Sequence, residues 1–184
     1  NNNVFNDGSE FGSLLMKHCI GGLLANMKQS MLIFAPHLNS YKRMTPDQHA
    51  PISALWGYEN RTASIRVPGG EFKDRRIEHR VSGADTNPYL ITIAILGAAL
   101  HGIENTIEPK APVVGDCYSI IVDDEYVLPK NWNEAIRLFE FGDRIGGSIT
   151  PEMHDMIVRM KKQELSVFSQ RITPFEYQSY LQQV

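Results

Sequence analysis

Hydrophobic residues recur every three or four positions after Ser13, which is the spacing of one helix face. A Ser13 cap followed by this stripe predicts a helix that runs to about Leu32, with its apolar positions at Leu14, Leu15, Cys19, Leu23, Met27 and Met31. Gly21 and Gly22 lie inside the helix, where each glycine costs roughly 1 kcal/mol relative to alanine. Glycines at these positions predict that another backbone packs closely against the helix.

A second helix is predicted to begin at Asn87-Pro88, because asparagine caps helices and proline suits the first turn. We expect it to end at about His101, before Gly102. This segment is apolar on nearly every side, so we expect it to be the buried helix of the domain. Three further helices are predicted at residues 133–141, 151–168 and 174–181, after an extended surface connection over 104–130.

Two segments alternate polar and apolar residues with the period of a strand, residues 62–67 and 74–81, and a Pro-Gly-Gly turn follows the first. Two strands do not form a stable sheet alone. We therefore expect an α+β fold in which helices pack on a small antiparallel hairpin whose partner strands lie outside this chain. The chain also begins without methionine, and we expect it to be a piece of a longer protein.

The polar face of this hairpin is the strongest chemical signal. Alternation places Arg76, Glu78 and Arg80 on one face of the second strand, with Ile77, His79 and Val81 on the other. If the strands pair, Arg66 joins the same charged surface. Guanidinium groups bind phosphate and carboxylate through forked contacts, and a carboxylate can bind a metal ion. The alternative is that these arginines form ordinary surface ion pairs.

Composition restricts the remaining possibilities. The chain has 184 residues, enough for one domain, with 21% charged residues and a net charge of −3. This balance gives no general affinity for nucleic acid, although an anion- or nucleic-acid-binding module would explain the arginines. Cys19 and Cys117 lack a CxxC context and are predicted to be reduced, as in a cytoplasmic protein. No apolar run is long enough to span a bilayer, so we expect no membrane contact.

Five ordered motifs carry a family resemblance. They are residues 39–43 (NSYKR), Ala50-Pro51, residues 56–68 (WGYENRTASIRVP), residues 76–80 (RIEHR) and residues 84–90 (ADTNPYL). Together they resemble the C-terminal part of the catalytic domain of the glutamine synthetase family. The phrases around WGYENR and IEHRV resemble the branch of glutamate–putrescine ligases and γ-glutamylpolyamine synthetases.

The resemblance implies an ATP-dependent ligase that phosphorylates the side-chain carboxylate of glutamate and then lets an amine displace the phosphate. It implies Mg²⁺ or Mn²⁺ as the metal and a homo-oligomer of stacked rings. The family's N-terminal β-grasp domain and most of its metal ligands precede the region matched here. We therefore expect the 184-residue chain alone to be inactive. A non-catalytic ligand-binding or assembly protein of the same fold is the alternative.

By the same resemblance, Arg61, Arg66 and Arg76 contact the nucleotide, with Arg61 the candidate for stabilising phosphoryl transfer. Lys73 can approach the adenine. The resemblance assigns Arg43 to the α-carboxylate of glutamate and Arg80 to the neighbourhood of the reacting carboxylate. Glu78 matches a metal-ligating glutamate, and a hard oxygen ligand suits Mg²⁺ or Mn²⁺.

His49 departs from the family pattern. In the ammonia-using enzymes a glutamate precedes the Ala-Pro pair, whereas this chain has His49 before Ala50-Pro51. A neutral imidazole binds ammonium poorly but can accept a proton from a larger amine near neutral pH. His49 is thus a catalytic candidate or simply a loop residue, and the acceptor is either ammonia or a polyamine or other primary amine.

Overall fold

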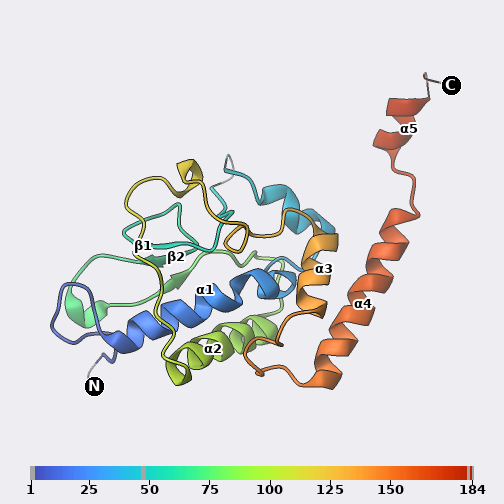
Figure 1. Ribbon diagram of the computed structural model, residues 1–184. Coiled ribbons are helices and arrows are strands. Elements are labelled where there is room, and N and C mark those ends of the chain that lie inside the picture. The colour runs from blue at the N-terminus through green and yellow to red at the C-terminus, as the bar shows by residue number, and fades with distance from the viewer. Residues whose placement is uncertain (1–2, 47–48, 182, 184) are drawn as a thin grey trace.

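The computed structural model describes residues 3–46, 49–181 and 183. Its central element is helix α1 (Leu14–Phe34), which lies between a small sheet and helix α2 (Pro88–Glu104) (Figure 1). As predicted, Ser13 caps α1 by accepting a hydrogen bond from the Met16 N–H. The side chains of Met16, Ile20, Met27, Met31 and Phe34 are at most 2% exposed. Because α1 has neighbours on opposite sides, it is the buried helix of the domain.

The expectation that α2 is the buried helix is wrong. Tyr89, Leu96 and Leu100 on α2 are 79%, 58% and 54% exposed, and the residues that α2 buries are all alanine or glycine. A uniformly apolar helix signals that several faces are suited to burial, but it does not show which of them a given chain covers. α2 also continues to Glu104, past the predicted stop at Gly102.

The glycines of α1 do mark a close approach between backbones, as predicted. A Cβ atom added to Gly22 would lie 2.6 Å from the Cα of Gly102 on α2 and would collide with the Ala98 carbonyl oxygen. A Cβ on Gly21 would collide with the Ile107 carbonyl oxygen, which belongs to the segment after α2.

The sheet has three strands in the order β1 (Trp56–Tyr58), β2 (Ile65–Val67) and β3 (Glu78–His79). β2 and β3 pair antiparallel, with Arg66 opposite Glu78, as the predicted hairpin requires. β1 pairs parallel to β2, with Trp56 opposite Ile65. One partner strand expected outside the chain is therefore inside it, and the sheet is mixed. β2 and β3 are shorter than the alternating segments 62–67 and 74–81 from which the hairpin was predicted.

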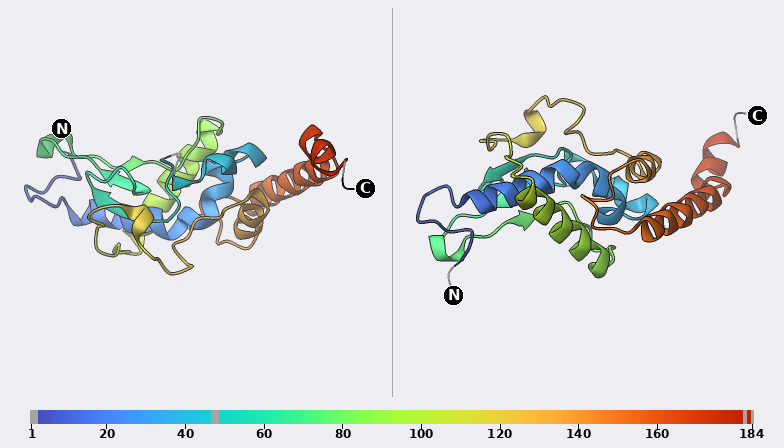
Figure 2. Two further views of the ribbon diagram at one scale, coloured as in Figure 1. Left: turned by 90° about the horizontal axis from the view of Figure 1, so that it is seen from above. Right: turned by 60° about the horizontal axis from the view of Figure 1, so that its bottom comes forward.

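The remaining elements are short 3-10 helices and three α-helices. The 3-10 helices are η1 (Leu38–Arg43), η3 (Phe72–Asp74) and η4 (Cys117–Ser119); the α-helices are α3 (Trp132–Glu140), α4 (Pro151–Ser169) and α5 (Pro174–Tyr180). The region 104–130 is largely exposed as expected, although Cys117 and Leu128 are buried. α4 packs against α3, and α5 extends away from the body (Figures 1 and 2). Within the described ranges, no helix is long and apolar enough to cross a membrane.

Candidate functional site

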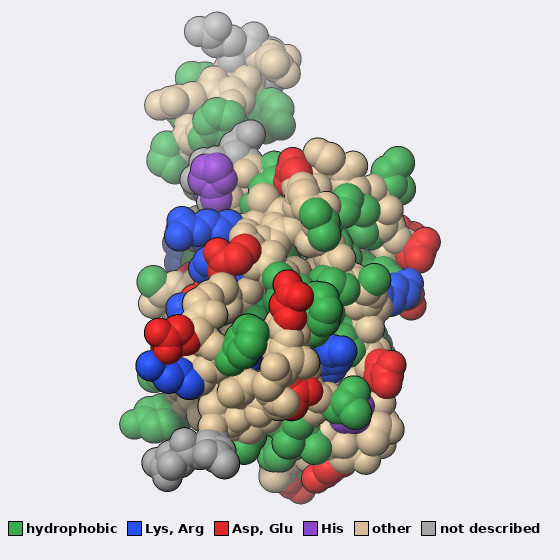
Figure 3. All heavy atoms as spheres, turned by 90° about the vertical axis from the view of Figure 1, so that its left-hand side faces the viewer, with side chains coloured by type: hydrophobic (Ala, Val, Ile, Leu, Met, Phe, Trp, Pro, Cys, Tyr) green, Lys and Arg blue, Asp and Glu red, His purple; other side chains and the backbone are tan. Residues whose placement is uncertain are grey.

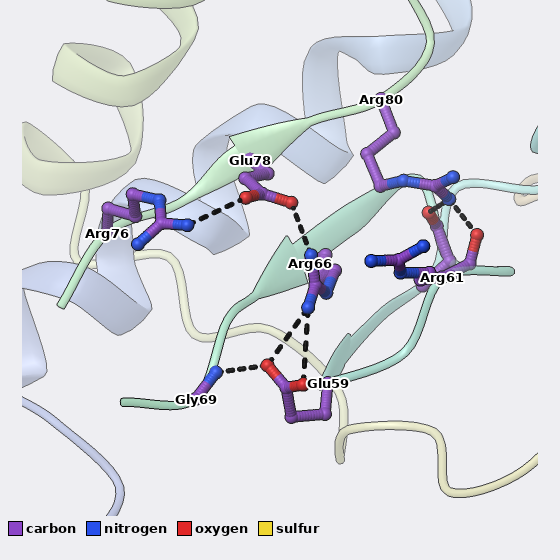
Figure 4. A network of polar contacts seen from close by, with 8 residues as sticks. Glu59, Arg61, Arg66, Gly69, Arg76, Glu78 and Arg80 are labelled. Carbon is purple, nitrogen blue, oxygen red and sulfur yellow. Dashed lines mark hydrogen bonds and ion pairs between the residues drawn. The ribbon is translucent and has the colours of Figure 1, made fainter. Parts of the chain in front are cut away.

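The predicted charged face forms around the Arg66–Glu78 pair of the sheet. The two residues are opposite each other on β2 and β3, so their side chains leave the sheet on the same side. The Arg66 Nη1 atom donates to Glu78 Oε2 at 2.9 Å, and Arg76 Nη2 donates to Glu78 Oε1 at 3.2 Å (Figure 4). Both carboxylate oxygens of Glu78 are thus engaged by arginine. The alternating pattern placed these three side chains together.

A second carboxylate, Glu59, completes the cluster and was not among the predicted site residues. Arg66 Nη2 donates to both of its oxygens, at 3.1 and 3.2 Å, and the Gly69 N–H also donates to it. The Gly69 hydrogen bond and then Arg66 lower the pKa of the Glu59 carboxyl. Desolvation opposes the charged form of Arg66, but the hydrogen bonds to Glu78 and Glu59 outweigh it and raise the pKa of that guanidinium. The signal for Glu59 was its place two residues before Arg61, just after β1.

Arg61 and Arg80 meet on the turn between β1 and β2. Arg80 Nη1 donates to the carbonyl oxygens of Arg61 and, at 3.1 Å, Ala63 (Figure 4). The Arg61 side chain lies beside Arg66 in the same view, is exposed, and forms no ion pair within the described residues. Arg66 and Arg76 thus pair with the two carboxylates, while Arg61 and Arg80 pair with neither. Four guanidinium groups and two carboxylates leave this region with a formal surplus of positive charge, which suits a polyanion.

Arg43 lies at the end of η1, close to the chain that leaves β3. Its Nη2 atom donates to the Val81 carbonyl oxygen at 2.5 Å. Its Nε atom is buried and has no hydrogen-bond partner within the described residues. The contact with Val81 joins Arg43 to the residue that follows Arg80.

Within the described residues, neither Lys73 nor His49 forms a hydrogen bond or ion pair with these arginines. Lys73 lies on η3, is 71% exposed at its side chain, and pairs with Glu71 at 2.7 Å. His49 is exposed and has a left-handed backbone, with φ of 52°. Among the described residues its ring forms no hydrogen bond or ion pair, and it follows two residues outside the described ranges. The roles assigned to Lys73 and His49 stay predictions.

His79 occupies the opposite face of β3, as the alternation predicted. Its ring packs on Phe34 of α1 with 4.4 Å between ring centroids, and both ring nitrogens are buried. Within the described residues these nitrogens have no hydrogen-bond partner. Burial lowers the pKa of His79 from 6.5 to about 4, so the ring is neutral at pH 7.

The pKa of His79 predicts that the protein loses stability in mild acid. The unfolded chain takes up the His79 proton near pH 6.5 and the folded chain only near pH 4, so this stabilisation is complete above pH 6.5 and is lost as the pH falls toward 4. The loss amounts to about 3 kcal/mol. Denaturant midpoints at pH 7, 5.5 and 4 should therefore fall more steeply for the wild type than for His79→Phe. His37→Gln, at a partly exposed histidine, is the control; equal slopes for wild type and His79→Phe would contradict the assignment.

The donor set fits nucleotide phosphates better than it fits a metal alone. Arg61, Arg66 and Arg76 supply forked cationic donors on one side of the sheet. Glu78 supplies one hard oxygen ligand, but no group of three or more His, Cys, Asp or Glu within the described ranges is placed to hold a metal ion. The described residues thus do not by themselves supply three such side-chain ligands for a metal ion. On the face seen in Figure 3, basic and acidic side chains are interspersed, unlike a continuous basic surface for nucleic acid.

The fold and this cluster define a class of protein: an α+β domain whose small sheet carries arginines and carboxylates on one face. A model of the glutamine synthetase catalytic domain matches residues 1–180. The chain therefore belongs to the glutamine synthetase family, as its motifs predicted.

Similar proteins come from both the family's sequences and its solved structures. Over 162 residues the chain is 35% identical to gamma-glutamylethanolamide synthetase GlnA4 of Streptomyces coelicolor, covering 88% of this chain and 34% of that protein. It is 33% identical over 174 residues to gamma-glutamylputrescine synthetase PuuA of Escherichia coli, covering 95% and 36%. A solved complex of GmaS with ADP superposes with a TM-score of 0.84 at 27% identity, covering 99% and 43%. The chain thus spans about a third of the length of these curated relatives.

Proposed function

We propose that the full-length protein joins an amine to the γ-carboxylate of glutamate, using ATP to form γ-glutamyl phosphate as the intermediate. The observation that carries the proposal is the positive cluster around Arg66 and Glu78, in which Arg61 has no ion-pair partner within the described residues. Phosphoryl transfer needs positioning and compensation of negative charge more than covalent help from the protein. An arginine-rich face in a glutamine synthetase domain meets that need.

We assign some of the arginines to ATP and the others to glutamate. Arg66 and Arg76 bind the ATP phosphates, and Lys73 approaches the adenine. Arg43, whose buried Nε has no hydrogen-bond partner among the described residues, binds the α-carboxylate of glutamate. Arg80 lies near the reacting carboxylate. Fixing both substrates lets the γ-carboxylate oxygen attack the γ-phosphorus of ATP, which breaks the bond to the β,γ-bridging oxygen and releases ADP. Because the substrates are already oriented, little orientational freedom is lost in this step.

Charge develops on the transferred phosphoryl group, and we assign its stabilisation to Arg61. The amine then attacks the acyl carbon of γ-glutamyl phosphate, its proton passes to His49, and phosphate leaves. Glu78 would hold one Mg²⁺ or Mn²⁺ ion once its carboxylate has released Arg66 and Arg76. The remaining ligands would come from outside the described residues. When bound, such an ion neutralises phosphate charge. A homo-oligomer of stacked rings is part of this proposal.

The acceptor is ammonia or a primary amine, and two observations favour the amine. The chain has His49 where the ammonia-using enzymes have glutamate. In addition, two similar proteins are named for ethanolamide and putrescine products. A neutral imidazole accepts a proton from an organic amine without requiring a cation-binding carboxylate.

Phosphate release by the full-length protein tests the proposal. With glutamate and MgATP, release should depend on added putrescine or ethanolamine more strongly than on ammonium, judged by kcat/KM. The 184-residue chain alone should form no γ-glutamyl hydroxamate with hydroxylamine. A stronger response to ammonium would select ammonia as the acceptor. Inertness toward every amine, with glutamate and ATP still bound, would instead favour a non-catalytic ligand-binding or assembly protein.

A further inference from the structure

The buried amide of Asn60 lies next to the candidate residue Arg61. Asn60 is 9% exposed, and its Nδ2 atom donates to the carbonyl oxygens of Val113 at 3.1 Å and Gly115 at 2.8 Å. These acceptors are more than fifty positions away along the chain. One side chain therefore uses both of its N–H donors to hold a distant segment against the turn between β1 and β2.

The other end of the same amide fixes the turn itself. Asn60 Oδ1 accepts from the Thr62 N–H at 3.0 Å and from the Thr62 hydroxyl at 2.7 Å. Thr62 Oγ1 in turn accepts from the Cys117 N–H at 2.9 Å. We call residues 110–117 the strap. Trp56 fastens it as well, since its Nε1 donates to the Lys110 carbonyl oxygen at 2.7 Å and its carbonyl oxygen accepts from the Val113 N–H at 2.8 Å.

Arg80 holds the opposite side of the turn by donating to the carbonyl oxygens of Arg61 and Ala63. The backbone on both sides of Arg61 is therefore fixed, while its side chain stays exposed. Glu59, just before Asn60, has a φ of 49°, which non-glycine residues adopt rarely. Such a backbone conformation persists where surrounding contacts enforce it.

A cavity of about 260 Å³ lies between this turn and the strap. It is lined by Tyr58, Glu59, Asn60, Arg61 and residues 112–115. The hydrogen bonds of Asn60 cross from one wall of the cavity to the other. They thus set both the backbone from which Arg61 projects and the distance of the strap from it.

We propose that Asn60 is a positioning residue for Arg61 in the ligase reaction, acting by fastening the strap to the turn that carries Arg61. The inference rests on the proposed function, because the role it supports is the action of Arg61 on the transferred phosphoryl group. Asparagine suits this position because the amide provides two donors and one acceptor in a fixed plane. An aspartate would direct an oxygen at the carbonyl oxygens of Val113 and Gly115, which repel it.

The test is a double-mutant cycle in the full-length protein. Asn60→Asp should lower kcat for amine-dependent phosphate release by roughly 10- to 100-fold, since small misplacements of a reacting group have effects of this size. The KM for glutamate should change less than about threefold, because this residue acts on a later step. In an Arg61→Ala background, Asn60→Asp should lower kcat by less than about twofold. Asn105→Asp, at an exposed asparagine after α2, is the matched control.

Thr62→Val provides a second variant should Asn60→Asp fail to fold. It removes the hydroxyl that joins Asn60 Oδ1 to the Cys117 N–H, so it should lower kcat several-fold, again only when Arg61 is present. Thr62→Ser keeps the hydroxyl and should retain the wild-type rate. Effects that multiply fully with Arg61→Ala would overturn the inference.

Hydrogen exchange separates this inference from the proposed function. Asn60→Asp should speed amide exchange in residues 113–117 and 60–63 of the full-length protein, whether or not the protein is a ligase. A wild-type protein without amine-dependent turnover would defeat the proposed function. Unchanged exchange in both segments would defeat the positioning role of Asn60 even in an active enzyme.

Discussion

Replacing Arg61 with alanine is expected to lower kcat of the full-length protein by about 10³-fold, the scale seen when a cation that stabilises a phosphoryl-transfer transition state is removed. The Arg61 guanidinium lies beside Arg66 and forms no ion pair within the described residues, although its charge contributes to the lowered pKa of Glu59. Arg66, by contrast, is paired with both Glu59 and Glu78. The charge of Arg61 is therefore available for a substrate. The KM for glutamate should change little, because the interaction develops with the transition state rather than with ground-state binding.

Arg61→Lys keeps the charge but loses the fork, so it should recover only part of the rate. Arg159→Ala, at an exposed arginine of α4, is the matched control and should leave kcat within about twofold, as surface substitutions away from a site generally do. Rates are measured as phosphate release with saturating glutamate, ATP and amine. A kcat of Arg61→Ala close to that of Arg159→Ala would remove Arg61 from the mechanism.

Elements with a repeating pattern or a cap were predictable from the sequence. The Ser13, Asn87, Thr150 and Thr173 caps fix where four helices begin. Each places a side-chain acceptor at the free N–H groups of the first turn, an interaction local to a few residues. The burial of α2 was not predictable in this way, because it depends on what else covers the helix.

β1 was missed because three residues with glycine in the middle are too short to show a period of two. It is defined by hydrogen bonds to β2, and these depend on the turn that contains Glu59 and Asn60. The Arg66–Glu78 pair, by contrast, followed from alternation and hairpin pairing alone. Local patterns thus predicted the centre of the cluster but not its neighbouring strand.

The loop-borne part of the site has no periodic signal. Arg43 lies on a 3-10 helix and Arg61 on a turn, so only the family resemblance brought them into the site. The roles of Glu59 and Asn60 depend on contacts with Gly69 and with the strap, which no local pattern encodes. A catalytic side chain must nevertheless be held in place, and the fixed turn does this for the backbone of Arg61.

Gly22→Ala is expected to destabilise the protein by about 3 kcal/mol, and so to lower its Tm. The Cβ would lie 2.6 Å from the Cα of Gly102, a contact between backbones that no side-chain rotation can relieve. α1 and α2 would have to separate, which would also loosen the buried side chains between them. Thermal unfolding of the full-length protein, followed by circular dichroism, measures the shift.

Helix propensity alone predicts the opposite sign for this substitution, because alanine is better than glycine in a helix interior by about 1 kcal/mol. Ala25→Gly, at an exposed position of the same helix, isolates the propensity effect and should destabilise by about that amount. If Gly22→Ala raised Tm, the close packing of α1 on α2 would be wrong. A fall larger than that of Ala25→Gly means that the cost of separating two backbones exceeds the preference of one helix for alanine.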